Sequence, residues 1–270
     1  MTTATAEPPV ASLLVESRPV IKKGVPTDGL MILVGHTKSG KTVFSASFPN
    51  SYVLELEKGR GDRVPGRIHD IAMGADRAGV NGLDLLRQVL PQVLGNPDIK
   101  TVVIDTVDVL IEWISDEIAR SKGLSSISER KAGVNGYELW GELFKRVEGM
   151  TDYLKSSGKL IILTAHCKAP EKDGEGTVIV PAGLNVPGKS GPYLASQADV
   201  IGYTYKKPMG STTKYFVSFQ GGPLAIWGTS IEEIADKTVE LDKASPYRSF
   251  AAEFGVKESE PEQKKNGRKK

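Results

Sequence analysis

The chain has 270 residues, of which 39% are hydrophobic and 25% are charged, and this suffices for one sizeable α/β core with tails. Its formal net charge of +2 excludes a polycation, so a nucleic-acid surface would have to be a local patch. A single cysteine, Cys167, excludes an intrachain disulfide.

Neither a membrane-spanning nor a secretory segment is predicted. No apolar run reaches the roughly 20 residues that span a bilayer. The first ten residues lack the basic start and apolar stretch of a signal peptide. We therefore expect a soluble protein of the cytoplasm without a membrane partner.

Composition divides the chain into three parts. Residues 1–24 are rich in Pro, Thr and Ala and are predicted to form a flexible lead-in, with a short strand at most at 12–16. Residues 256–270 carry many charges and few apolar side chains, so a disordered tail is expected. Its basic tip is interpreted as a solvating segment, with a weak nucleic-acid contact as the alternative. Residues 25–255, between these tails, are predicted to form the one folded domain.

Strand and helix patterns alternate between the tails. Short apolar, β-branched runs are typical of strands buried on both faces of a parallel sheet. The expected strands are 30–34, 52–56, 101–104, 160–164, 200–205, 214–219 and 224–227, the last ones partly antiparallel because of the turn at 221–223. The expected helices are 41–48, 83–94, 107–120 and 137–154. This alternation predicts an α/β fold with a mostly parallel central sheet flanked by helices, and antiparallel strands at its C-terminal end.

One helix carries an aromatic stripe. Aromatic and apolar residues recur there at helical spacing, namely Tyr137, Trp140, Phe144, Val147 and Leu154. We interpret the stripe as core packing rather than as a platform for nucleic-acid bases.

A phosphate-binding loop follows the first predicted strand. Its eight residues satisfy G-x-x-x-x-G-K-[ST] at every fixed position: Gly35, His36, Thr37, Lys38, Ser39, Gly40, Lys41 and Thr42. Glycines let the backbone turn its N–H groups toward phosphate oxygens. Lys41 would act catalytically as a charge near the β- and γ-phosphates, and Thr42 would offer a hydroxyl to Mg²⁺. The sequence therefore predicts an ATP and Mg²⁺ site.

Two later strand ends supply carboxylates. Asp105 closes an apolar strand in the Walker B pattern and is predicted to hold Mg²⁺ through a water. Thr106 is expected to cap the following helix, with support of the magnesium waters as the alternative. Glu55 and Glu57 end the strand at 52–56, taken to lie next to the loop; Glu57 is favoured as the group that orients the attacking water. The alternative is a surface pair that makes salt bridges.

The fourth strand ends at His166, which could sense the γ-phosphate and signal to the loop behind it. A hydrogen-bonded histidine without this role is the alternative.

Residues 168–192 are long for a connection, with a possible hairpin near 178–180, and carry Lys168, Lys172 and Lys189. They form one candidate DNA-contacting loop, and residues 121–135 form another. Both are assumed to follow strands at the nucleotide edge, and ordinary solvated loops are the alternative.

The order of these parts resembles the RecA/RadA core. The chain is more closely similar to the phage RecA-like ATP-binding proteins, often described as AAA-type, that include ATP-dependent single-strand annealing proteins. Matching stretches are 31–42, 53–57, 102–105, 163–166 and 198–203. The resemblance covers roughly residues 25–227 and implies a RecA-like P-loop NTPase core with ATP hydrolysis.

The resemblance also implies single-stranded DNA binding, homo-oligomer formation and action in phage-type recombination or repair. A phage single-strand binding protein is a possible partner. RecA-type sites take a cation from the neighbouring subunit, and Lys206 or Lys207 could supply it. The alternative is an ordinary exposed lysine pair. RecA itself carries further modules, and this chain has room only for the core.

Other functions stay open at this point. A nucleotide-gated binding module with little hydrolysis would need the phosphate loop but not Glu57. A small-molecule kinase would need an arginine-rich lid, and residues 168–192 contain no arginine. A GTPase would carry Asn-Lys-x-Asp, which is absent from the sequence. A helicase or packaging motor remains an alternative, although the sequence shows no obvious extra domains for such a function.

Overall fold

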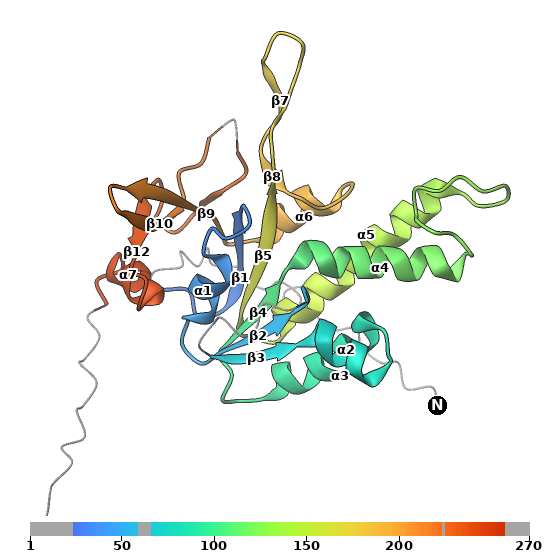
Figure 1. Cartoon of the computed structure of the whole chain (residues 1–270), viewed down its shortest axis with the longest axis horizontal. Coiled ribbons are helices and arrows are strands. Elements are labelled where there is room, and N and C mark those ends of the chain that lie inside the picture. Colours follow the sequence, from blue (N-terminus) through green and yellow to red (C-terminus); the bar gives the residue numbers. More distant parts are fainter. Residues whose placement is uncertain (1–23, 59–65, 223–224, 257–270) are drawn as a thin grey trace, which may run out of the picture.

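Apolar strands form one twisted sheet at the centre of the chain, shown by a computed structural model that describes residues 24–58, 66–222 and 225–256 (Figure 1). The parallel part consists of β3 (Arg67–Asp70), β2 (Ser51–Glu55), β4 (Thr101–Asp105), β5 (Leu160–Lys168), β1 (Gly29–Gly35) and β9 (Val200–Met209), in this spatial order. β10 (Thr212–Ser218) and β12 (Thr238–Leu241) continue it antiparallel beyond β9. The predicted fold class is therefore confirmed.

Four short strands accompany the main strands of this sheet in the described part of the chain. β8 (Gly183–Leu184) pairs with the end of β5, and β11 (Gly228–Thr229) pairs with β9. β6 (Glu171–Lys172) and β7 (Val178–Val180) form a separate hairpin that projects from the sheet edge in Figure 1. The hairpin near 178–180 is thus confirmed.

Helices cover both faces. Those that the structure describes are α1 (Lys41–Ala46), α2 (Ile71–Ala78), α3 (Gly82–Gly95), α4 (Val107–Ser121), α5 (Gly136–Ser156), α6 (Ser190–Gln197) and α7 (Pro246–Ala252). Side chains alternate along β1, so that Leu30 and Ile32 pack on the side of α3, α4 and α5, while Met31 and Leu33 pack on the side of α1 and α7. Both faces of the strand are buried, which explains its uninterrupted apolar run.

Several sequence predictions were wrong in detail. Tyr137 of the predicted stripe is 91% exposed, whereas Val147 and Leu154 are buried as predicted and Trp140 packs against the core. Leu139 and Leu143, which were not in the predicted stripe, complete the buried face of α5. Residues 225–227 form no strand; Ala225 makes only isolated bridges, and Leu224 lies outside the described residues. The antiparallel partners of β10 are β9 and β12. Part of the predicted turn, residue 223, lies outside the described residues.

The helices in the described part of the chain lack either the length or the apolar content needed to cross a membrane. The expected strand at 12–16 and the expected disordered tail after residue 256 lie outside the described residues.

Candidate functional site

Residues 35–42, here called the phosphate loop, connect the carboxyl end of β1 to α1. A Cβ atom at Gly35 would lie 2.4 Å from both the carbonyl oxygen and the Oγ1 of Thr204 on the adjacent β9. Gly40 has φ of +98°, and a Cβ there would lie 3.1 Å from the ring of Tyr215. Close approach therefore requires glycine at position 35, whereas at position 40 the positive φ is what favours glycine, with a tight contact to Tyr215 in addition.

A side-chain contact fastens the loop to the sheet. Ser39 is buried, and its Oγ lies 2.8 Å from Oγ1 of Thr204. Sequence reasoning did not identify Thr204, since it lies 165 residues farther along the chain and follows no motif. The side chains of His36, Thr37 and Lys38 are exposed at the rim.

The ammonium group of Lys41 is held inside the phosphate loop. Its Nζ donates to the carbonyl oxygens of Gly35 at 2.9 Å and His36 at 3.1 Å. The residue is only 6% exposed. A buried positive charge at the mouth of a glycine-lined turn suits an anionic ligand with several oxygens.

Two hydroxyls hold the Asp105 carboxylate. Thr42 Oγ1 donates to its Oδ2 at 2.6 Å, and the Thr164 hydroxyl donates to the other oxygen. β4 and β5 pair in a register that places Thr164 opposite Asp105. Thr42 and Asp105 thus offer adjoining hard oxygen atoms, which fit the ligand preference of Mg²⁺.

A cavity of about 620 Å³ opens beside the phosphate loop. Residues 37–42 line one side of it, and the C-terminal part of the sheet supplies the other side through Lys206, Tyr215, Leu241, Asp242, Lys243 and Pro246. Lys243 Nζ lies 5.8 Å from the centroid of the Tyr215 ring. An aromatic ring flanked by cations is suited to a planar base attached to phosphates. No local motif marks Tyr215 or Lys243, so sequence reasoning missed them.

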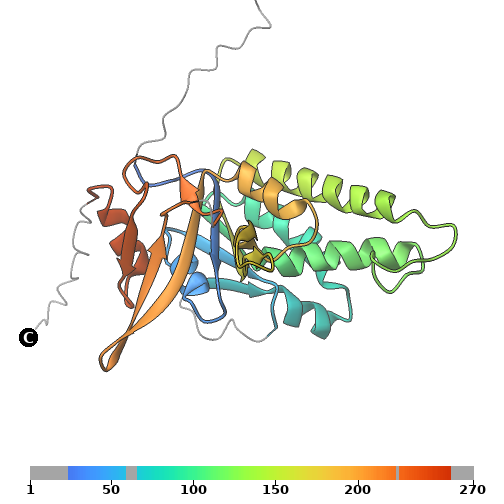
Figure 2. The same ribbon diagram turned by 90° about the horizontal axis from the view of Figure 1, so that it is seen from above.

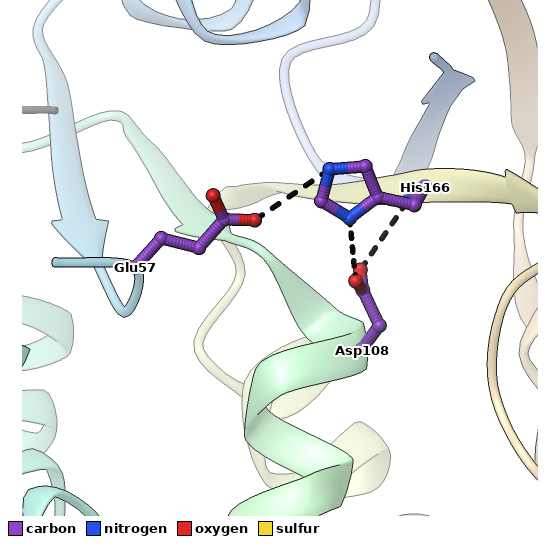
Figure 3. A group of neighbouring side chains, drawn as sticks. All are labelled: Glu57, Asp108 and His166. Carbon is purple, nitrogen blue, oxygen red and sulfur yellow. Dashed lines mark hydrogen bonds and ion pairs between the residues drawn. The ribbon is translucent and has the colours of Figure 1, made fainter. Parts of the chain in front are cut away.

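Glu57, Asp108 and His166, here called the acid–histidine cluster, meet at the same sheet edge (Figure 3). Glu57 follows β2, Asp108 lies in the first turn of α4, and His166 lies near the end of β5. His166 Nδ1 is 2.6 Å from Asp108 Oδ2, and its Nε2 is 3.6 Å from Glu57 Oε1. One ligand atom from each residue lies within 4.8 Å of the others. Asp108 was not predicted.

Two sequence expectations about Glu57 and Thr106 need correction. β2 does not adjoin β1, because β4 and β5 lie between them; Glu57 reaches the site through the carboxyl edge of the whole sheet. Thr106 stands at the N-cap of α4 without a side-chain capping bond, since its hydroxyl donates to Glu57 Oε1 at 3.3 Å instead. Glu55, by contrast, is buried within β2 at 1% exposure.

The two candidate DNA-contacting loops lie in different places. Residues 168–192 start at the end of β5 and include the β6–β7 hairpin, where Lys168 pairs with Glu171 at 2.5 Å. Residues 121–135 follow a helix and connect the far ends of α4 and α5, away from β1 and α1 in both views (Figures 1 and 2). The assumption that this second loop follows a strand at the nucleotide edge was wrong.

Cys167 follows His166, a member of the acid–histidine cluster, on β5. Burial raises its pKa, against the opposing charge of Lys41. The protonated thiol is a poor metal ligand, and the acid–histidine cluster does not include it.

A comparison of this sequence with models of known protein families identifies the family of the chain. A family model described as an AAA domain matches residues 29–225. The chain belongs to this AAA domain family. No curated protein matches this AAA domain protein.

Two solved archaeal structures are similar to the AAA domain protein. The KaiC-like protein PH0186 of Pyrococcus horikoshii OT3 is 13% identical, with 81% of this chain and 87% of that chain covered and a TM-score of 0.38. The flagellar accessory protein FlaH of Methanocaldococcus jannaschii is 13% identical, with 81% and 86% covered and a TM-score of 0.34. The strand order and the phosphate loop give the AAA domain protein an α/β P-loop fold with a mostly parallel sheet.

Proposed function

We propose that this chain is a Mg-ATP-dependent ATPase. The observation that carries the proposal is the meeting of Lys41, Thr42 and Asp105 with the acid–histidine cluster at one edge of a parallel sheet. The backbone of Leu56 donates to the carbonyl of Asp105 at 2.7 Å, which ties the two halves of the site together. Ligands of open α/β sheets bind at this edge.

The phosphate half would bind the nucleotide. The phosphate loop and Lys41 would hold the triphosphate, while Thr42 and Asp105 would hold Mg²⁺. Bound Mg²⁺ would neutralise charge on the phosphate oxygens during transfer. The ring of Tyr215 would form the wall of the base-side cavity.

The other half would act on water. Glu57 is 14% exposed in its side chain, accepts a hydrogen bond from Thr106, and faces the imidazole of His166. A carboxylate held in this way can orient a water molecule and take its proton. His166 would report occupancy of the site to residues 168–192, which follow it directly on the chain.

We further propose that the nucleotide state controls self-assembly and grip on single-stranded DNA, so that the protein promotes annealing or pairing in phage-type recombination. The support for this is the resemblance stated above and the lysines of residues 168–192, a segment that begins at the end of β5, two residues after His166. A phage single-strand binding protein would be a suitable partner. Lys206 lines the cavity of its own chain, whereas Lys207 lies over the rings of Tyr205 and Phe216. Both lysines are exposed, and either could be the cation given to a neighbouring subunit.

One experiment separates this proposal from a gated binding module. ATP turnover is measured with Mg²⁺, with and without single-stranded DNA, and solution mass is measured with and without nucleotide. We expect turnover that DNA stimulates, and a mass that increases with ATP. Nucleotide binding without turnover would favour the gated module, and turnover without a response to DNA would reject only the nucleic-acid part.

A further inference from the structure

Asp108 holds His166 with both of its carboxylate oxygens. Oδ2 lies 2.6 Å from the imidazole Nδ1, and Oδ1 accepts the backbone N–H of His166 at 3.2 Å. One side chain therefore fixes both the backbone and the ring of the histidine. Asp108 lies in the first turn of α4, a helix of fifteen residues packed on the sheet, so its own position is rigid.

This contact decides which ring nitrogen carries the proton. A carboxylate only accepts hydrogen bonds, so Nδ1 must be the donor to Asp108. In the neutral ring, Nε2 is then an acceptor. Figure 3 shows that Nε2 points toward Glu57, and 3.6 Å separates it from Oε1 of that carboxylate.

With Nδ1 as the donor to Asp108, one donor placed between Nε2 of His166 and Oε1 of Glu57 can serve both of these acceptors. A water molecule has two O–H groups and can donate one to each acceptor. Its remaining lone pairs would then point away from both. Thr106 restricts the carboxylate further, because its hydroxyl donates to the same oxygen of Glu57.

We propose that Asp108 is a positioning residue of the hydrolytic site: it fixes the tautomer and orientation of His166, so that Nε2 of His166 and Oε1 of Glu57 together orient one water. This inference rests on the proposed ATPase function and deepens it. It gives His166 a role in holding water, separate from sensing phosphate, and it gives Asp108 a role through the histidine.

The tautomer is read directly by ¹⁵N NMR of the histidine-labelled full chain. His166→Gln identifies the His166 signals against those of His36 and His69. We expect a protonated Nδ1 and an unprotonated Nε2 in the unaltered protein. Protonation of both nitrogens, as in an imidazolium paired with Glu57, would overturn the proposal, and this test needs no variant of Asp108.

Kinetics test the consequence. Asp108→Asn can donate its amide N–H to Nδ1, which favours the opposite tautomer and turns Nε2 into a donor. We expect kcat for ATP to fall about tenfold, as for other residues that orient a functional histidine, while the Kd of Mg-ATP stays unchanged. Glu112→Gln, an exposed carboxylate one turn along α4, is the matched control and should leave kcat unchanged.

A double variant decides whether Asp108 acts through His166. Asp108→Asn combined with His166→Gln should be no slower than His166→Gln alone. If the loss of kcat in the double variant equals the product of the two single losses, or if kcat of Asp108→Asn is unchanged, the positioning role is rejected. The proposed ATPase activity would be unaffected by either result. Absence of turnover in the unaltered protein would instead reject the proposed function itself, and the role of Asp108 with it.

Discussion

The phosphate loop and the acid–histidine cluster lie at the same sheet edge, yet they are built in opposite ways. The phosphate loop consists of eight consecutive residues, and its shape follows from Gly35, Gly40 and contacts with Thr204 and Tyr215. The acid–histidine cluster takes one side chain each from the end of β2, the start of α4 and the end of β5. The loop is a local structure, whereas the cluster depends on how separate elements pack.

This difference predicts that the two regions fail differently. Damage to the loop should abolish binding of the nucleotide, because the loop supplies the cradle itself. Damage to the cluster should leave binding and reduce turnover, because its members would act on water and not on the phosphate cradle.

The largest effect is expected from Lys41→Ala. The change removes the buried ammonium group that lies between the carbonyl oxygens of Gly35 and His36. We expect Mg-ATP affinity to fall by at least about a hundredfold, since a charge-assisted contact to several phosphate oxygens is lost. Isothermal titration calorimetry measures it.

Two controls accompany this change. Lys145→Ala removes an exposed lysine from α5 and should leave affinity unchanged. Thermal unfolding of Lys41→Ala should stay close to that of the parent, because the lysine does not build the apolar core. Normal affinity in a folded Lys41→Ala protein would contradict the assignment of the phosphate loop.

Glu57→Gln should show the opposite behaviour. The amide keeps the size of the side chain but is a poor base, so we expect kcat to fall about a hundredfold or more with Kd for Mg-ATP nearly unchanged. A phosphate-release assay and a binding titration on the same sample measure both. An unchanged turnover would show that Glu57 is not a catalytic residue and would favour the nucleotide-gated binding module.

Tyr215→Ala should have a smaller effect on the base side of the cavity. The ring lines the cavity and packs against Gly40. Loss of one aromatic wall should raise the KM for ATP about tenfold with little change in kcat, which corresponds to ~1.4 kcal/mol. Tyr215→Phe keeps the ring and should behave like the parent. Equal losses in both variants would assign the effect to the hydroxyl and not to the ring.

The smallest effect concerns the helix layer that carries Asp108. Glu117 on α4 binds Arg87 of α3 through two contacts of 2.6 and 2.8 Å and also pairs with Arg146 of α5. The hydrogen bond from Arg87, aided by Arg146, lowers the pKa of Glu117 to about 2. The ionised carboxylate therefore stabilises the fold above the ordinary pKa of 4.5, and this contribution is lost as the pH falls from 4.5 toward 2.

Because these groups are partly exposed, Glu117→Gln should cost about 0.5–1 kcal/mol at neutral pH. Urea unfolding at pH 7 and pH 3 measures the free energy of unfolding, and the difference between variant and parent should shrink at the lower pH. Glu112→Gln again serves as the exposed control on the same helix. A difference that does not depend on pH would contradict the ionic origin of the contribution.

Local features of the site were predictable from the sequence. The phosphate loop, the strand that ends in Asp105 and the strand that carries His166 near its end each occupy one short stretch with its own pattern. Helix patterns placed α3, α4 and α5 to within a few residues. The packing of Tyr137 was not predictable, because helical spacing alone does not tell which of two adjoining apolar stripes faces the sheet.

Nonlocal features were missed for one common reason. Tyr215 lines the cavity only because β10 turns back antiparallel on β9, and Asp108 meets His166 only because α4 starts beside β5. Thr106 looked like a helix cap, yet its hydroxyl turns to Glu57 across the site.

The phosphate loop, the apolar strands and the order of the acidic strand ends can be read from local sequence patterns, since each of these depends on neighbouring residues whose spacing fixes backbone geometry. The folded sheet, by contrast, is what places β4 and β5 between β2 and β1 and brings Glu57, Asp108 and His166 together. Strand order and side-chain neighbours are set by packing over the whole sheet, and residues 51 to 109 positions apart carry no local trace of it.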